Sequence, residues 1–170
     1  NMFVDDRSLL ASWNAAHLDL LVFEETWNSG SFTTQGWTRS GGTNWGIATG
    51  FGNPAPSAQF NWSPSVTNYD QSLISPNITG IGSPGLNLKY DIYLSNYGTT
   101  TLEELAVEIW DGTAWDRLAY YNNAQGDIPW TSETKNIDSY SFSTFKIRFR
   151  AYGQDSYNIN NWNIDNIRVV

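Results

Sequence analysis

Apolar and polar residues alternate along much of the second half of the chain, which is typical of β-strands with one buried face. The alternation runs through residues 86–95, 105–110 and 145–152. An Asp-Gly pair at residues 111–112 marks a turn, so residues 115–121 are predicted to pair back as a hairpin. Several antiparallel strands, each with one apolar face, predict an all-β fold built as a two-sheet sandwich.

The last predicted strand, residues 157–170, changes its pattern partway along. Trp162 and Ile164 share one side of an extended strand, whereas the later apolar residues fall on the opposite parity. A β-bulge at Asp165-Asn166 would absorb the extra residue and turn the carboxylate away from a regular ladder. We therefore expect Asp165 to have a specific role; the alternative is that it caps a turn or pairs with a nearby arginine.

The first half of the chain has weaker strand signals. Residues 20–27 look extended, and residues 72–76 form a short strand closed by a proline. Residues 50–64 contain three prolines and are predicted to be an irregular connection. We see no internal repeat and no second domain.

Residues 1–19 follow a helical pattern instead, and Asp5 and Asp6 are candidate helix caps. The residues that recur at helical spacing are Leu9, Leu10, Trp13, Ala16, Leu20 and Leu21. We interpret residues 1–21 as an N-terminal extension and residues 22–170 as one domain. The extension is either a linker folded onto the sandwich or, through residues 1–19, a docking segment for a neighbouring domain or subunit.

Composition narrows the function. Aromatic residues make up 15% of the chain and charged residues only 15%, so neutral polar groups must keep the surface soluble. The net charge of −8 argues against nucleic acid and anionic membrane surfaces as partners, but it is compatible with Ca²⁺. No apolar run approaches the roughly 18 residues that a membrane span needs. There is no cysteine for a disulfide or a thiolate.

Several motifs, in this order along residues 22–170, resemble the MAM-like jelly-roll modules, including bacterial choice-of-anchor J and cleaved-adhesin domains. They are F-E-E at residues 23–25, G-W at 36–37, S-L-I-S-P at 72–76, L-N-L-K-Y-D-I-Y-L from residue 86, F-K-I-R-F-R-A-Y-G from 145 and W-N-I-D-N-I-R-V from 162. The resemblance implies an antiparallel two-sheet jelly roll on a secreted or cell-surface protein. It also implies a mostly non-catalytic role in adhesion, glycan binding or protein binding.

Many members of that family carry a structural Ca²⁺ near the first and last strands. Carried over by position, the acid of the first strand matches Glu24, with Glu25 adjacent, and the acid of the last strand matches Asp165. The loop before Trp45 would add Asn44 or main-chain carbonyls. The resemblance thus implies calcium as the cofactor.

Candidate ligand-binding residues lie on the outward parity of the long strands: Tyr93, Trp110, Arg148 and Arg150, with Asp91 and Glu108 among them. Aromatic rings among hydrogen-bonding groups suit a pyranose, which has an apolar face and a polar edge. The alternatives are that the two rings only cover a sheet face and that the arginines are balanced by cross-strand acids. Catalysis is not expected, because the only histidine, His17, lies in the N-terminal extension.

Together these patterns predict a non-enzymatic extracellular module, stabilised by calcium, that binds a glycan or a surface protein. Two alternatives stay open. One is a structural subunit or spacer of a surface assembly. The other is an accessory domain of a secreted peptidase or glycanase.

Overall fold

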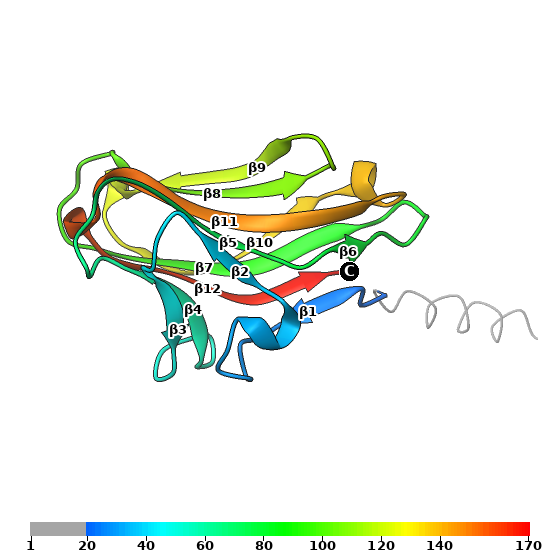
Figure 1. The fold of residues 1–170 in the computed structure, drawn as a ribbon, viewed down its shortest axis with the longest axis horizontal. Coiled ribbons are helices and arrows are strands. Elements are labelled where there is room, and N and C mark those ends of the chain that lie inside the picture. The colour runs from blue at the N-terminus through cyan, green and yellow to red at the C-terminus, as the bar shows by residue number, and fades with distance from the viewer. Residues whose placement is uncertain (1–19) are drawn as a thin grey trace, which may run out of the picture.

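Two antiparallel sheets lie face to face in the computed structural model, which describes residues 20–170 (Figure 1). This arrangement confirms the predicted all-β sandwich. The helix and the docking role predicted for residues 1–19 lie outside the described residues. No helix within residues 20–170 is long and apolar enough to cross a membrane.

Each sheet has six strands. Sheet A has the spatial order β10 (Ile128–Asn136), β7 (Asn87–Asn96), β12 (Ile159–Val169), β4 (Ser57–Asn61) and β3 (Trp45–Ala48), and β1 (Phe23–Glu25) also pairs with β12. Sheet B has the order β2 (Thr38–Ser40), β5 (Thr67–Ile74), β11 (Thr144–Asp155), β8 (Glu103–Trp110) and β9 (Trp115–Asn122), and β6 (Ile78–Thr79) pairs with β11. Four short 3₁₀ helices interrupt the described chain: η1 (Thr33–Gln35), η2 (Asn123–Gln125), η3 (Asp138–Tyr140) and η4 (Ser156–Asn158).

The core fills the space between the sheets with the apolar residues of the alternating strands. In β7 the inward residues Leu88, Tyr90, Ile92 and Leu94 are all buried, as the alternation predicts. The largest fully buried side chains are aromatic and include Trp27, Trp37, Trp45 and Trp162. Since each buried large apolar side chain contributes about 1.5–3 kcal/mol, this layer holds the two sheets together.

The predicted hairpin is confirmed, because β8 and β9 pair with Trp110 opposite Trp115. The prediction for residues 50–64 is wrong, because β4 lies within them and pairs with both β12 and β3. This strand has only two inward apolar residues, Ala58 and Phe60. The alternating stretch is therefore too short to indicate a strand against the turn signal of the flanking prolines. Its place in the sheet is determined by its neighbours rather than by its own pattern.

The predicted β-bulge is also confirmed. In the pairing of β12 with β7, Asp165 lies opposite Asp91 and Arg168 lies opposite Lys89, so β12 carries one extra residue between these pairs. Asn166 has a positive φ of 49°, as the kink requires. The bulge lets the apolar residues on both sides of it, from Trp162 to Val169, reach the same core.

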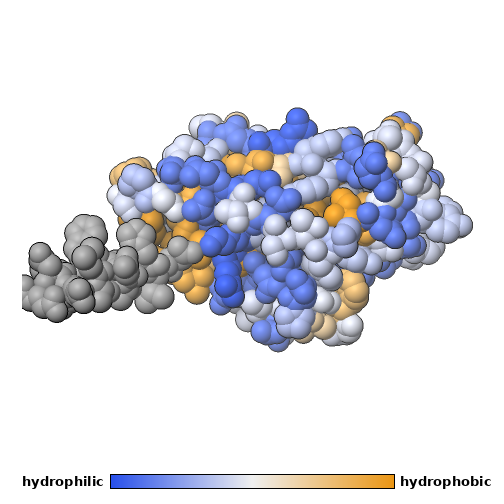
Figure 2. Space-filling model, turned by 180° about the vertical axis from the view of Figure 1, so that it is seen from behind, coloured by the Kyte–Doolittle hydropathy of each residue, from blue (hydrophilic) through white to orange (hydrophobic). Residues whose placement is uncertain are grey.

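The face seen in Figure 2 is mostly hydrophilic, with small separate apolar areas rather than one continuous patch. This agrees with a chain of low charge whose surface is covered by neutral polar side chains.

Candidate functional site

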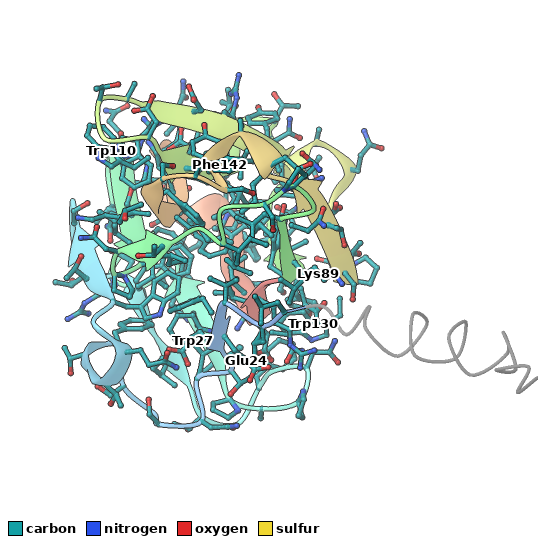
Figure 3. All side chains as sticks on the ribbon, turned by 90° about the vertical axis from the view of Figure 1, so that its right-hand side faces the viewer. Glu24, Trp27, Lys89, Trp110, Trp130 and Phe142 are labelled. Carbon is teal, nitrogen blue, oxygen red and sulfur yellow. The ribbon has the colours of Figure 1, made fainter. Side chains whose placement is uncertain are left out.

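The four predicted ligand-binding residues do not form one site. Tyr93 lies on β7 and faces outward from sheet A, whereas Trp110, Arg148 and Arg150 lie on β8 and β11 and face outward from sheet B. Figure 3 shows Trp110 well separated from Trp130, a neighbour of Tyr93. The molecule therefore has two separate candidate surfaces.

The outer face of sheet B is rich in charge, and its charges are paired. Arg148 forms an ion pair with Glu108 and lies over the Trp115 ring, 4.2 Å from its centroid. Arg150 binds Asp70 through two hydrogen bonds of 2.8 and 2.6 Å. The hydrogen bond from Arg150 holds the pKa of the Asp70 carboxyl below its usual range. The basic side chains are balanced by acids on neighbouring strands.

The outer face of sheet A carries a group of aromatic side chains that are partly exposed. The Tyr93 ring lies 4.9 Å from that of Phe51 and 5.4 Å from that of Trp130, and the Phe51 and Trp130 rings are stacked 5.7 Å apart. We call Phe51, Tyr93 and Trp130 the aromatic platform. Phe51 is 38% exposed. The Tyr93 hydroxyl and the Trp130 indole nitrogen make no hydrogen bond to a described residue.

Sequence reasoning missed Phe51 and Trp130. Phe51 lies in the loop between β3 and β4, inside the stretch predicted to be irregular. Trp130 lies in β10, a strand with so many polar residues that no alternation of apolar and polar positions can be recognised. The only available signal was a tryptophan within a short polar run, which is weak without the neighbouring strands.

A row of four side-chain amides lies beside the platform: Gln59, Asn61, Asn161 and Asn163. Asn163 pairs with both Gln59 and Tyr93, so the row is level with the platform across three strands. The Asn163 amide donates to the Ser57 hydroxyl at 2.9 Å and accepts from Asn161. An amide group has two donors and two acceptor sites. Asn163 is buried, so the hydrogen-bonding capacity left for a ligand lies with the partly exposed amides of Gln59, Asn61 and Asn161.

A second aromatic group lies at the other end of the same strands. Trp62 directly follows β4 and Tyr97 directly follows β7. The Tyr157 ring lies 5.3 Å from Trp62 and 5.2 Å from Tyr97. Tyr97 is 65% exposed. The amide row therefore has the aromatic platform beside it across the strands and this second aromatic group at one end.

The β-bulge places Asp165 close to Glu25. Asp165 is buried and accepts backbone hydrogen bonds from Asn53 at 2.7 Å and Asn166 at 2.8 Å. Glu25 accepts from the Trp27 backbone N–H at 2.7 Å through Oε1, while its Oε2 is buried without a hydrogen-bond partner in the described part of the chain. We call Glu25 and Asp165 the carboxylate pair.

Burial sets the acidity of this pair. Loss of water around each group raises the pKa of Glu25 and the pKa of Asp165. Hydrogen-bond donors oppose this rise: the Trp27 and Thr26 backbone and the nearby Trp37 indole lower the pKa of Glu25, and the Asn53 and Asn166 backbone lower that of Asp165. The charge of Asp165 adds to the rise in the pKa of Glu25, and the charge of Asp91 does the same for Asp165. These groups repel one another when ionised, so a proton or a cation would stabilise them.

The other two predicted calcium ligands lie elsewhere. Glu24 points to the opposite side of β1 from Glu25 and forms an ion pair of 2.8 Å with Arg168. The Asn44 side chain bonds to Gln71 and to the carbonyl of Asn61, at the end of β4 far from the Asp165 pairing. Within residues 20–170, no group of three His, Cys, Asp or Glu side chains is arranged to hold a metal ion.

Solved structures of known proteins share this fold. The K3 cleaved adhesin domain of Lys-gingipain from Porphyromonas gingivalis matches with a TM-score of 0.65 and 15% identity, over 88% of this chain and 98% of that one. The module TmCBM61, solved in complex with β-1,4-galactotriose, matches with a TM-score of 0.57 and 15% identity, over 85% and 93% of the chains.

A xylan-binding domain, CBM22-2 from Paenibacillus barcinonensis, matches with a TM-score of 0.53 and 12% identity, over 88% and 98% of the chains. No family model and no curated protein sequence matches this chain. The fold is therefore that of the cleaved adhesin domain and of β-sandwich carbohydrate-binding modules, which confirms the architecture that the sequence resemblance implied.

Proposed function

We propose that this chain is a non-catalytic, extracellular carbohydrate-binding or adhesion module that holds a glycan on the outer face of sheet A. The observation that carries this proposal is the aromatic platform beside the amide row. The Trp130 and Tyr93 rings offer flat apolar surfaces for the C–H face of a pyranose, and the amides of Gln59 and Asn161 offer donors and acceptors for its hydroxyls.

Similar folds support the class of function. The matched structures are described as a cleaved adhesin domain, a module bound to a galactotriose and a xylan-binding domain. Neutral sugars also fit the chemistry of this face, because it is built from amides and aromatic rings. The proposal assigns binding to this face and leaves the paired charges of sheet B to stability.

The glycan proposal is tested by titrating the full chain with neutral oligosaccharides of galactose, mannose and xylose in a calorimeter. Trp130→Ala and Tyr93→Ala should each weaken binding by roughly tenfold or more, because each removes an aromatic anchor. Trp115→Ala is the matched control on the other sheet and should leave the affinity unchanged. The assignment is rejected if Trp115→Ala weakens binding as much as the two platform variants do, or if Trp115→Ala alone weakens it.

We also propose that Ca²⁺ binds at the carboxylate pair. The buried and unpartnered Oε2 of Glu25 fits a cation, and the mutual repulsion of the pair favours one. A full shell needs six to eight oxygens, so main-chain and amide oxygens would supply most of it. Bound there, Ca²⁺ would tie β1 to β12, the first and last strands.

The calcium proposal predicts that Ca²⁺ raises the melting temperature of the full chain and that a chelator lowers it, since a ligand bound only by the folded state stabilises it. Asp165→Ala should abolish the difference between the two conditions. Glu24→Ala is the control, because Glu24 pairs with Arg168 instead, and it should keep the response. An unchanged melting temperature in wild type at saturating Ca²⁺ contradicts the proposal.

A further inference from the structure

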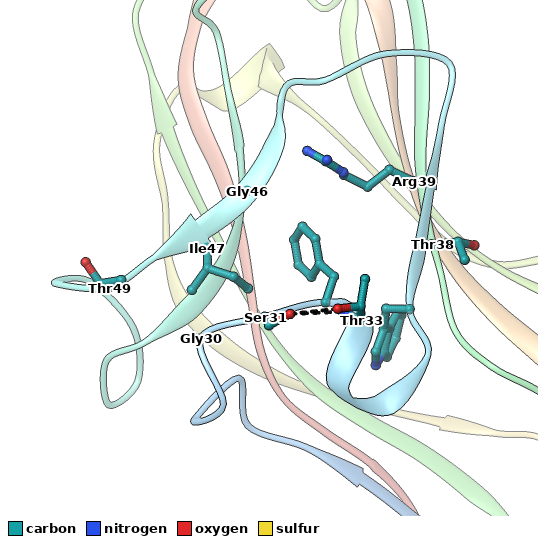
Figure 4. Close-up of a pocket in the computed structure, with 10 residues that line it drawn as sticks. Gly30, Ser31, Thr33, Thr38, Arg39, Gly46, Ile47 and Thr49 are labelled. Atoms are coloured by element: carbon teal, nitrogen blue, oxygen red, sulfur yellow. Dashed lines mark hydrogen bonds between the residues drawn. The ribbon is translucent and has the colours of Figure 1, made fainter.

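A cavity of about 670 Å³ opens between β2 and β3, the edge strands of the two sheets. It is separate from the amide row and from the carboxylate pair. Its lining contains Ser31, Phe32, Thr33, Thr38, Arg39, Ile47 and Thr49, together with Gly30, Trp37 and Gly46. Figure 4 shows Arg39 extending from its strand across the opening towards the strand that carries Gly46. A cavity of this volume is within the range of small-molecule sites and is large enough for a sugar ring.

Arg39 is the charged group of this cavity, and its charge has no acidic partner among residues 20–170. Its Nη1 donates to the main-chain carbonyl of Trp45 at 2.9 Å, which fixes the side chain across the opening. By contrast, Arg148, Arg150 and Arg168 each form an ion pair with a carboxylate. A guanidinium has five donors, so most of those of Arg39 stay available to an anion.

Hydroxyl groups also line the cavity. Ser31 and Thr33, joined by a hydrogen bond of 3.0 Å between their side-chain oxygens, lie across the opening from the Arg39 guanidinium, and Thr49 adds a hydroxyl at the end of β3 (Figure 4). Each hydroxyl can both donate and accept, so the rim can bind ligand hydroxyls in either sense. The floor is apolar, formed by Phe32 and Ile47.

We propose that this cavity binds a uronic acid residue of a glycan, with the sugar carboxylate on Arg39. The planar guanidinium matches the two oxygens of a carboxylate, and the Ser and Thr hydroxyls match the ring hydroxyls of the same sugar. In a protein of net charge −8, a cationic cavity without an acidic partner in the described chain is a specific attraction for one anionic group. The inference rests on the proposed function only in taking the ligand to be a glycan, because the residues are different.

The test titrates the full chain with short oligomers of galacturonic, glucuronic and mannuronic acid, and with neutral galactotriose for comparison. At least one acidic oligomer should bind, and Arg39→Gln should weaken it roughly ten- to a hundredfold, the range for a hydrogen bond to a charged group. Arg39→Lys should restore only part of the affinity, since lysine lacks the planar fork. Raising the salt concentration should weaken acidic but not neutral binding.

Arg117→Gln is the matched control, because Arg117 lies on β9, at the opposite edge of sheet B from Arg39, over the Tyr120 ring, 5.3 Å from its centroid. It should leave acidic binding unchanged, and thermal melts should show each variant folded. The inference is overturned if no acidic oligomer binds, or if Arg39→Gln binds one as well as wild type does. If Trp130→Ala abolishes acidic binding while Arg39→Gln keeps it, the acid lies on the aromatic platform; this inference then fails and the proposed function stands. If the wild-type chain binds an acidic oligomer but not galactotriose, that result would count only against the proposed function.

Discussion

The two outer faces of the sandwich are built from the same kind of strand but treat their polar groups in opposite ways. On sheet B, Glu108 and Asp70 neutralise Arg148 and Arg150, and aromatic rings lie against the guanidinium groups. On sheet A, the polar groups of β4 and of the first half of β12 are uncharged amides beside partly exposed aromatic rings. Polar groups that are already paired with one another have few hydrogen-bonding positions free for a ligand. A face with unpaired donors and acceptors beside aromatic surface can bind one.

This contrast predicts that the charges of sheet B contribute to stability. Glu108 is buried and faces both Arg148 and Arg150, so Glu108→Ala leaves two partly buried cations with less compensation. We expect it to lower the free energy of unfolding by about 3–5 kcal/mol, as for a broken buried ion pair. Urea denaturation measures this. Asn161→Ala on sheet A should lower the free energy of unfolding by less than about 1 kcal/mol. If the two substitutions lower it equally, the two faces do not differ in their contribution to stability.

The amides of sheet A should affect binding more than stability. The Gln59 Nε2 group donates to no other group in the described part of the chain, and Oε1 accepts one long bond from Asn61 at 3.4 Å. Gln59→Ala should therefore weaken neutral oligosaccharide binding roughly threefold to tenfold, the value of one hydrogen bond, and leave the melting temperature nearly unchanged. Lys146→Ala, on the outer face of sheet B, should change neither quantity. A stability loss without an affinity loss would contradict this division.

The smallest effect concerns pH and the carboxylate pair. Because burial raises the pKa of Glu25, the folded state binds this proton more tightly than the unfolded state. Its contribution to the free energy of unfolding therefore falls as the pH rises from the ordinary glutamate range through the raised pKa. In the presence of a chelator, Glu25→Gln should thus be more stable than wild type at neutral pH, with a flatter pH profile.

Asp70 gives the opposite sign and serves as the comparison. Arg150 lowers the pKa of Asp70, so its contribution is present above the ordinary aspartate range and is lost as the pH falls through the lowered pKa. Asp70→Asn should therefore lower stability at neutral pH and remove part of the acid dependence. Urea titrations at a series of pH values measure both variants. If the two substitutions change the profile in the same direction, the electrostatic account of these groups is wrong.

The long strands could be predicted from the sequence because apolar and polar residues alternate within each of them. Residues 86–95 alternate over five inward positions, and Leu88, Ile92 and Leu94 are all buried. The bulge at Asp165 was readable because the parity of the apolar residues changes there. By contrast, β4 has two inward apolar residues between prolines, so only its pairing with β12 and β3 determines it as a strand.

The candidate sites were less predictable because they join residues from distant segments. Tyr93 was found from its outward parity, but its partners Phe51 and Trp130 come from a loop and from an edge strand. Likewise, Arg39 carries no local signal, because what distinguishes it is a carbonyl partner on β3 in place of an acid. Parity identifies the face on which a residue lies, whereas the neighbours across a sheet depend on register.

The central claim is that a glycan lies on the outer face of sheet A, and side-chain NMR tests it most directly. A titration of the ¹⁵N-labelled full chain with a neutral oligosaccharide that binds in the calorimeter follows indole and amide signals on both faces. The account predicts saturable shifts for the Trp130 indole and the side-chain amides of Gln59 and Asn161, with the Trp110 and Trp115 indoles unmoved. Shifts confined to Trp110 and Trp115 would place the ligand on sheet B and contradict the account.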